Sequence, residues 1–138
     1  MKIALIADDK KKELIAQFCI AYCGTLAKHE LCATGTTGKY IEEATGLEIE
    51  KLLSGEQGGV QQISSRVAYD EIDMLIYMRD AANDHSEVSR EVTENLLRLC
   101  DIHSVPAATN IATAEMLIVG LERGDLDWRR NLKGNVDL

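Results

Sequence analysis

Apolar runs and helical spacings alternate along this chain and predict five units of a strand followed by a helix. Four of the expected strands are short apolar runs, the third alternates apolar and polar residues, and each is followed by polar residues or glycine. Each expected helix has apolar residues three or four positions apart. The expected strands are Lys2–Ala7, Leu31–Ala33, Leu47–Leu53, Ile72–Met78 and Val105–Ala108. The first helix shows its spacing through Leu14, Ile15, Phe18, Cys19, Tyr22 and Leu26. Asp8 or Asp9 is expected to cap this helix, because a carboxylate is stabilised at the positive end of a helix.

The later helices carry the same spacing, and the alternation as a whole predicts the fold class. A chain of 138 residues with no long linker is expected to be a single domain over residues 1–138. Its expected class is α/β, a doubly wound, mostly parallel five-stranded sheet with helices on both faces. Apolar residues of the last helix predict an interface with other copies of the chain. They are Met116, Ile118, Val119 and Leu121.

Polar or glycine-rich segments follow every expected strand. Ligands of an open parallel sheet bind outside the carboxyl ends of its strands. These ends carry Asp8-Asp9, Thr34–Gly38, Ser54–Gly59, Arg79-Asp80 and Thr109-Asn110. We therefore expect one cleft at this edge of the sheet.

The composition of the chain argues against nucleic acids and membranes as partners. The chain has 15 Lys and Arg against 23 Asp and Glu, a formal net charge of −8. No nucleic-acid partner is expected, since phosphate backbones are held by clustered cations. No apolar run approaches the length of a membrane span, and the N-terminus is too short for a signal peptide. We therefore expect a cytoplasmic protein with no membrane contact.

The four cysteines allow a disulfide or a zinc site, but reduced structural thiols are the favoured interpretation. Cys19 and Cys23 stand four apart with no CxxC pair nearby, and three of the four cysteines occupy apolar positions in periodic segments. Such thiols are typical of a cytosolic chain.

The segment Ala33-Thr34-Gly35-Thr36-Thr37-Gly38 predicts an anion-binding loop between a strand and a helix. Backbone N–H groups, hydroxyls and the positive end of a helix together suit a phosphate. Ser54-Gly55 opens a second loop of the same chemistry, and Lys12 in the first helix adds a cation. The segment is neither a P-loop nor a dinucleotide fingerprint, so it does not indicate a nucleotide. The alternative is a tight turn in which glycine allows a positive φ and threonine caps locally.

A further set of motifs runs in order along nearly the whole chain, from Lys2 to about Trp128. These are Lys2–Ala7, Asp9–Lys12, Ala33–Gly38, Ala44–Gly46, Ser54-Gly55, Gly58-Gly59, Gln61-Gln62, Arg79-Asp80, Leu97–Asp101 and Ala108–Asn110. The motifs resemble those of methylglyoxal synthase. The resemblance implies a homohexameric lyase, without metal or cofactor, that acts on dihydroxyacetone phosphate. Proton removal forms an enediolate in that family, phosphate is expelled, and the released enol becomes methylglyoxal. The family's phosphate site maps onto Lys12, Thr34, Thr36, Thr37, Ser54 and Gly55.

The catalytic residues of the family are only partly present. Its Gly-Gly-Asp-Gln-Gln pattern, whose aspartate is the base, has Val60 at the aspartate position, and a valine cannot accept a proton. The family's His-Asp after the first strand is Asp8-Asp9 here, and its Asp-Pro-Leu after the fourth strand is Asp80-Ala81-Ala82. The loop that follows is two residues longer here, and His85 is the counterpart of a family histidine.

Several groups are candidates to replace the missing base, because the chemistry needs only one carboxylate within reach of the carbon acid. The candidate catalytic residues are Asp9, Asp80, His85 and Asp8, and Asp84 and Glu87 are further carboxylates near the cleft. Surface or capping roles suit His29 and His103 better than catalysis.

Two functions of different classes follow. One is a working methylglyoxal synthase with a rearranged set of acids. The other is a sensor or regulatory subunit on the same fold, since the regulatory domain of the carbamoyl phosphate synthetase large chain also resembles this family. The expected ligand is dihydroxyacetone phosphate or inorganic phosphate. The sequence leaves open whether Arg129, Arg130 or Lys133 reaches the site of a neighbouring subunit.

Overall fold

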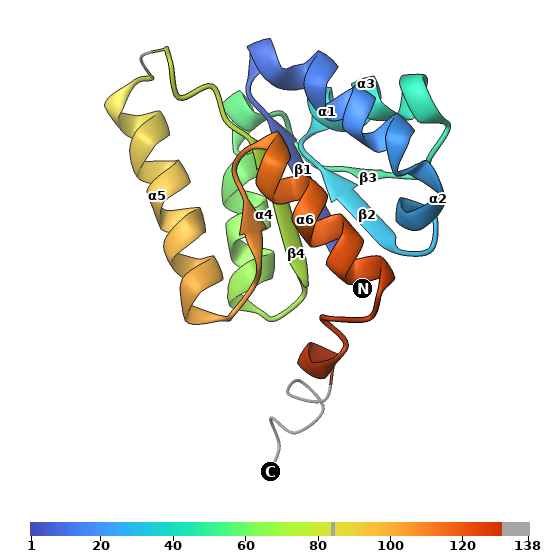
Figure 1. The fold of residues 1–138 in the computed structure, drawn as a ribbon. Helices are drawn as coiled ribbons and strands as arrows, with labels where there is room; N and C mark the ends of the chain where they lie inside the picture. The colour runs from blue at the N-terminus through green and yellow to red at the C-terminus, as the bar shows by residue number, and fades with distance from the viewer. Residues whose placement is uncertain (84, 131–138) are drawn as a thin grey trace.

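Strands and helices alternate in the computed structural model, which describes residues 1–83 and 85–130 (Figure 1). The strands are β1 (Lys2–Ala7), β2 (Glu30–Ala33), β3 (Glu50–Lys51), β4 (Met74–Met78) and β5 (Ala107–Ala108). The α-helices are α1 (Lys12–Ala21), α2 (Cys23–Leu26), α3 (Gly35–Thr45), α4 (Gly59–Ala68), α5 (Glu87–Ile102) and α6 (Ile111–Glu122). Two short 3₁₀ helices, η1 (Asp9–Lys11) and η2 (Gly55–Gln57), precede α1 and α4.

The strands form one parallel sheet in the order β3-β2-β1-β4-β5, which confirms the predicted doubly wound α/β class. The chain winds from β1 through β2 to β3, and then continues with β4 and β5 on the other side of β1. The strand order therefore reverses between β1 and β4, which pair from Ile3 with Met74 to Ala7 with Met78. Ligands of open α/β sheets bind at such a switch point, outside the carboxyl ends of the strands.

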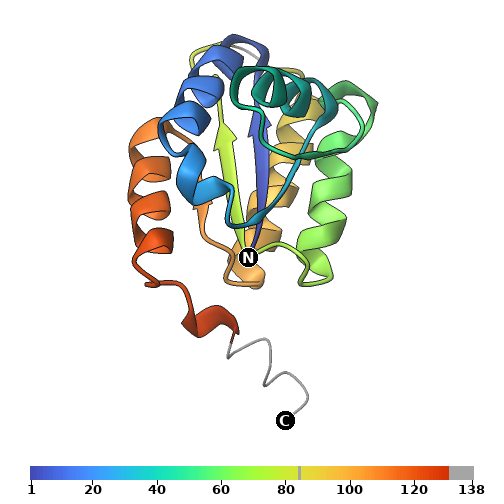
Figure 2. The same ribbon diagram turned by 90° about the vertical axis from the view of Figure 1, so that its right-hand side faces the viewer.

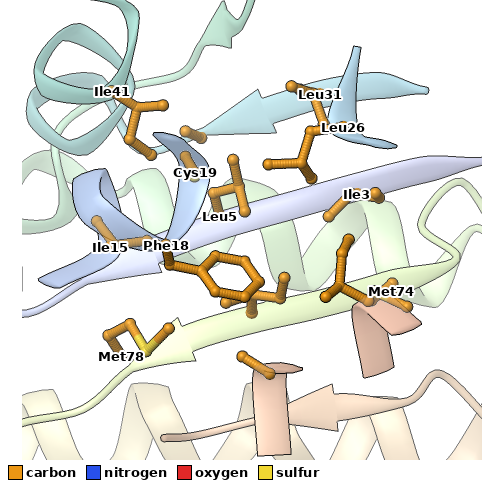
Figure 3. Close-up of a cluster of buried hydrophobic side chains, with 14 of the residues drawn as sticks. Ile3, Leu5, Ile15, Phe18, Cys19, Leu26, Leu31, Ile41, Met74 and Met78 are labelled. Carbon is orange, nitrogen blue, oxygen red and sulfur yellow. The ribbon is translucent and has the colours of Figure 1, made fainter. Parts of the chain in front are cut away.

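Helices cover both faces of the sheet, as predicted (Figure 2). Successive side chains of a strand point to opposite faces, so β1 contributes to two cores. Ile3 and Leu5 pack with residues of α1, α3 and α6, and this core is drawn in Figure 3. Ala4 and Ile6 pack with residues of α4 and α5 on the other face. Burial on both faces explains why the central strands are continuous apolar runs.

Two segments predicted as loops are shorter than expected, because helices begin inside them. Helix α3 begins at Gly35, so only Thr34 of the predicted Gly/Thr loop precedes it. A side chain does not fit at Gly35, where a Cβ would lie 2.8 Å from the carbonyl oxygen of Leu52. Helix α4 begins directly after Gly58, which has a positive φ of 106°. Both helices therefore present the N–H groups of their first turns at the edge of the sheet.

The predicted third strand and the predicted interface helix also need correction. Only two residues of the range 47–53 pair with β2, while Leu47 and Ile49 are buried in the core beside the sheet. In α6, Met116 and Val119 are exposed as the interface prediction requires. Ile118 and Leu121 of the same helix are buried against the sheet instead, so they do not form a surface for another subunit.

All four cysteines are free thiols, and Cys19, Cys32 and Cys100 are buried. Burial, with a smaller effect of Cys23, raises the pKa of Cys19 to about 12, and burial raises the pKa of Cys100 to about 11. Buried thiols of this kind behave as small apolar side chains. Within residues 1–83 and 85–130, no group of His, Cys, Asp or Glu is arranged to hold a metal ion. No helix in these ranges is long and apolar enough to span a bilayer.

Candidate functional site

At the carboxyl edge of the sheet, backbone hydrogen bonds join the ends of β1 and β4, and join the segment after β2 to the segment after β3. The Asp8 N–H donates to the carbonyl of Met78 at 3.0 Å and so ties the end of β1 to the end of β4. The Gly35 N–H donates to the carbonyl of Leu53 at 3.0 Å, which holds the start of α3 against the second glycine-rich segment. The two segments predicted to share an anion therefore lie side by side.

Lys12 is the cation at the centre of this edge. Its Nζ donates to the carbonyl of Ala7 at 2.8 Å and to Thr37 Oγ1 at 3.3 Å, and it lies 3.5 Å from Asp9 Oδ1. The Lys12 side chain is only 14% exposed, whereas that of Asp9 is 91% exposed. The ammonium is therefore fixed by the end of β1 and the first turn of α3, with one solvated carboxylate beside it.

Two of the three threonines in this segment are hydrogen-bonded to Lys12, directly or through one another, and the third is not. Thr34 and Thr37 are buried, and the Thr34 hydroxyl donates to Thr37 Oγ1 at 3.2 Å. Thr36 is exposed, although the resemblance places it in the phosphate site. In the described chain, the N–H groups of Thr36 and Thr37 have no hydrogen-bond acceptor, as is usual in the first turn of a helix. A cation, two hydroxyls and a helix N-terminus thus converge.

Ser54 and Gly55 lie next to this cluster. A Cβ placed on Gly35 would be 3.4 Å from the Ser54 nitrogen, which shows how closely the two segments approach. The Ser54 carbonyl accepts hydrogen bonds from the N–H groups of Gln57 and Gly59, which shape the turn into α4. Gly55 is exposed, so its backbone is accessible to a ligand.

Val60 stands beside the same segment, on the first turn of α4. Its Cγ2 would lie 3.9 Å from a Cβ placed on Gly55, and the residue is only 8% exposed. Its methyl groups belong to the core formed by α4 and α5. Val60, at the position where the resemblance implies a base, therefore lies next to the predicted phosphate site, and its side chain is apolar.

Asp8 is held more tightly than a free acid would be. Its Oδ1 accepts a hydrogen bond from the Tyr77 hydroxyl at 3.0 Å, and its Oδ2 accepts one from the Asp80 N–H at 2.7 Å. The predicted cap by Asp8 or Asp9 is absent: Asp8 precedes η1 without a side-chain cap hydrogen bond, and the N-cap residue of α1 is Lys11, which makes none either. Asp8 instead bridges the ends of β1 and β4.

Asp80 and His85 form the other side of this network. The buried Asp80 accepts a hydrogen bond on Oδ2 from Asn83 Nδ2 at 2.6 Å. His85 Nε2 lies 2.7 Å from the Asp80 carbonyl oxygen, so this nitrogen carries the proton and donates it; the same nitrogen is 3.7 Å from Asp8 Oδ2. Glu87 is exposed at the start of α5, and Asp84 lies outside the described residues.

Tyr77 and Thr93 complete the network and were not predicted from the sequence. Both are buried, and their oxygens are 3.5 Å apart. Burial raises the pKa of Tyr77 above its usual range, so the phenol is neutral and donates its proton to Asp8. Tyr77 has the spacing of a buried strand residue, and no local signal marks its contact with a carboxylate 69 positions away.

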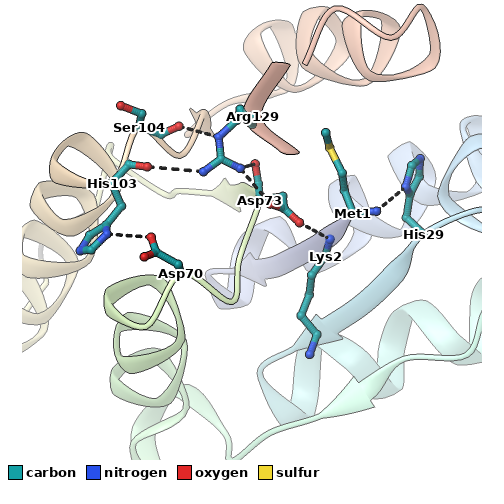
Figure 4. Close-up of polar contacts among 8 residues, drawn as sticks. All are labelled: Met1, Lys2, His29, Asp70, Asp73, His103, Ser104 and Arg129. Carbon is teal, nitrogen blue, oxygen red and sulfur yellow. Dashed lines mark hydrogen bonds and ion pairs between the residues drawn. The ribbon is translucent and has the colours of Figure 1, made fainter. Parts of the chain in front are cut away.

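Arg129, His103 and His29 lie at the opposite edge of the sheet, among the residues drawn in Figure 4. Arg129 is buried, with its NH1 2.9 Å from Asp73 Oδ1 and its Nε donating to the carbonyl of Ser104 at 2.8 Å. His103 Nδ1 pairs with an exposed aspartate, and His29 Nδ1 lies 3.2 Å from the N-terminal amine. Burial and that amine lower the pKa of His29. Arg130 is exposed beside Arg129, and Lys133 lies outside the described residues.

Comparisons with known proteins find similar sequences and a similar structure. A family model described as an MGS-like domain matches residues 18–109. Methylglyoxal synthase of Caldicellulosiruptor saccharolyticus is 58% identical over 129 residues, which cover 94% of this chain and 90% of that protein. The enzyme of Geobacillus sp. (strain WCH70) is 53% identical over 137 residues, covering 97% of this chain and 94% of that protein. The crystal structure of methylglyoxal synthase from Elizabethkingia anophelis NUHP1 superimposes with a TM-score of 0.74 at 36% identity, covering 85% of this chain and 76% of that one. The chain therefore belongs to the methylglyoxal synthase family.

Proposed function

We propose that this protein binds dihydroxyacetone phosphate and eliminates its phosphate to give methylglyoxal, at a rate limited by the valine at position 60. The observation that carries the proposal is the cluster of Lys12, Thr34 and Thr37 at the first turn of α3. Relatives named methylglyoxal synthase, at up to 58% identity, support the formation of methylglyoxal.

The phosphate would take the place of contacts that the cluster now makes within itself. The Lys12 ammonium and the Thr34 and Thr37 hydroxyls supply side-chain donors, and the N–H groups of Thr36 and Thr37 supply backbone donors. Ser54 and Gly55 close the other side of the anion. Hydrogen bonds to a charged group contribute about 1.5–3 kcal/mol each, so a few of them suffice for specific binding.

Asp9 is the carboxylate that we assign as the base in this chain. It lies 3.5 Å from Lys12, and therefore near a substrate whose phosphate that lysine holds. Asp8 has donors on both carboxylate oxygens, and Asp80 is buried against Asn83, so neither is as accessible. A solvated carboxylate on a short 3₁₀ turn is less well fixed than one on a helix, and a small misplacement of a base costs rate.

The reaction proceeds in two bond-breaking steps. Asp9 takes a proton from the hydroxymethyl carbon of the substrate, which leaves an enediolate. The hydroxyl proton on that carbon then passes to the enediolate oxygen, so that the carbon becomes an aldehyde and the double bond shifts to the carbon that bears the phosphate. The carbon–oxygen bond to the phosphate breaks at the same time, and phosphate leaves with its electron pair and the proton that Asp9 had taken. The enol product takes up a proton in water at the carbon that bore the phosphate and becomes methylglyoxal. One inorganic phosphate is released per triose.

The alternative is a sensor that binds the same phosphate without turnover, and Val60 is the single observation that favours it. Its apolar side chain fills the family's base position. Relatives named after an enzyme favour elimination over a sensor.

Two variants test the proposal together. Lys12→Met should raise KM at least about tenfold, because it removes the cation of the phosphate site. Asp9→Asn should lower kcat at least about tenfold, since general base catalysis contributes about 10²–10⁴-fold, without weakening the binding of inorganic phosphate in calorimetry. Lys39→Met, on the exposed side of α3, is the matched control and should change neither. Turnover that is unchanged in both Lys12→Met and Asp9→Asn would contradict the assigned site.

We also propose that the protein works in the cytoplasm and assembles as a homohexamer, of which the family resemblance implies the hexamer. Exposed Met116 and Val119 on α6, with Trp128 beyond it, support a surface that other subunits cover. Light scattering at micromolar concentration should report the mass of six chains, and a monomer would contradict the assembly.

A further inference from the structure

The Asp8 carboxylate connects the end of β1 to the end of β4 at the candidate site. Its two oxygens hold two different residues that flank the end of β4, the Tyr77 hydroxyl and the Asp80 N–H. The side chain is 19% exposed, so water competes only weakly for these donors. A carboxylate in this position is suited to fixing its neighbours rather than to taking a proton from a substrate.

Tyr77, the donor to Asp8 Oδ1, is itself oriented by a residue of α5. Tyr77 is buried and gives its only hydroxyl proton to Asp8. Its oxygen can accept the proton of Thr93, 3.5 Å away on α5. A relay of three groups, Thr93 to Tyr77 to Asp8, therefore runs from α5 to the edge of the sheet.

The relay ends on Asp80 and His85, two of the candidate catalytic residues predicted from the sequence. Asp8 holds the N–H of Asp80, and the carbonyl of Asp80 holds His85 Nε2 at 2.7 Å. The Asp80 side chain is fixed separately by Asn83, through Oδ2. Rotation of the Asp8 carboxylate would release the Asp80 backbone and, with it, the imidazole of His85.

We propose that Tyr77 is a positioning residue of this site, whose hydroxyl fixes the Asp8 carboxylate and thereby the placement of Asp80 and His85. The inference rests on the proposed elimination reaction. It is particular to this chain, because the family resemblance has a histidine at the position of Asp8. A carboxylate that is removed from water needs a hydrogen-bond donor on each oxygen. The Asp80 N–H is the donor to Asp8 Oδ2, and the Tyr77 hydroxyl is the donor to Oδ1.

The test compares Tyr77→Phe with its parent in the Val60→Asp background, where turnover is raised. Hydrogen–deuterium exchange mass spectrometry, resolved to the Asp80 amide, reports directly on the hydrogen bond from this amide to Asp8 and does not require an active enzyme. We expect exchange of this amide to be at least about tenfold faster in Tyr77→Phe, because its acceptor is no longer held. We expect kcat for phosphate release to fall about tenfold with KM unchanged, as for a small misplacement of catalytic groups. Thr93→Val should move both quantities in the same direction by less.

Tyr22→Phe is the matched control, since it removes a phenol oxygen from the other face of the sheet and should move neither quantity. Unchanged Asp80 exchange in Tyr77→Phe overturns the proposal whether or not the protein is active. Faster exchange with unchanged kcat in an active Val60→Asp parent overturns the positioning role. If the Val60→Asp parent shows no turnover, by contrast, the proposed reaction itself is wrong, and the role of Tyr77 in that reaction is overturned with it.

Discussion

Restoring a carboxylate at position 60 should raise the rate of phosphate release. Val60→Asp places an acid on the first turn of α4, beside Gly55 of the predicted phosphate site. General base catalysis typically contributes about 10²–10⁴-fold, and Asp9 already supplies part of that in our proposal. We therefore expect kcat for dihydroxyacetone phosphate to increase at least about tenfold.

The substitution should leave the fold intact. Val60 is buried in the core of α4 and α5, so the lost apolar contact costs stability, whereas a carboxylate near a helix N-terminus regains about 0.3–1 kcal/mol. The two side chains are similar in volume, and the net cost should lie in the usual range of about 0.5–3 kcal/mol. That is less than the stability of about 5–15 kcal/mol typical of a domain.

Continuous measurement of phosphate release at saturating substrate is the assay, with Val60→Asn as the matched control. The asparagine has the shape and polarity of the aspartate but no basic carboxylate, so it should give no gain. Thermal melting of all three proteins confirms folding. A parent as fast as Val60→Asp, or an asparagine variant as fast as the aspartate variant, would refute the reasoning about this position.

Three further predictions concern the phosphate cluster, the opposite edge of the sheet and the buried thiols. Thr37→Val should weaken the binding of inorganic phosphate by roughly 1–3 kcal/mol in calorimetry, and Thr36→Val by less, because only the first is joined to the lysine; equal effects would contradict this. Arg129→Met should destabilise the fold by about 3–5 kcal/mol in denaturant unfolding, since it removes the cation that pairs with the buried Asp73 carboxylate, whereas the exposed Arg130→Met should stay near the wild type. Burial raises the pKa of Cys19 from 9.0 to about 12, so its contribution to stability is full below pH 9 and is lost as the pH rises toward 12. The melting temperature should therefore fall over that interval, and less steeply in Cys19→Ala; identical slopes would contradict the assignment.

The sheet and its layers could be predicted from the sequence because the signals are local. Strands buried on both faces, such as Met74–Met78, are continuous apolar runs, and the helices between them have a regular apolar spacing. The Gly/Thr segment was recognised by its chemistry, but its conformation was predicted wrongly. Helix α3 begins at Gly35 although glycine and threonine are poor helix formers. Close approach to Leu52 and Leu53 leaves room only for glycine at this position.

The candidate site was predicted less completely, because its contacts join residues far apart in the chain. Lys12, Thr34 and Thr37 come together as expected, but the exposure of Thr36 depends on the rotation of α3, which the sequence does not show. Asp8 was grouped with the candidate catalytic acids on the basis of its position alone. Its clamped state depends on Tyr77, a residue that resembles any other strand position until the two strands are paired.

The unsubstituted protein, mixed with dihydroxyacetone phosphate and followed by ³¹P nuclear magnetic resonance, tests the proposed function most directly. We predict that the substrate signal converts to inorganic phosphate at a rate proportional to protein concentration, with one equivalent of methylglyoxal formed. The same amount of Lys12→Met should convert the substrate much more slowly when the substrate concentration is low. A substrate signal that shifts on binding but disappears no faster than it does in buffer would contradict the account and identify the chain as a binding protein.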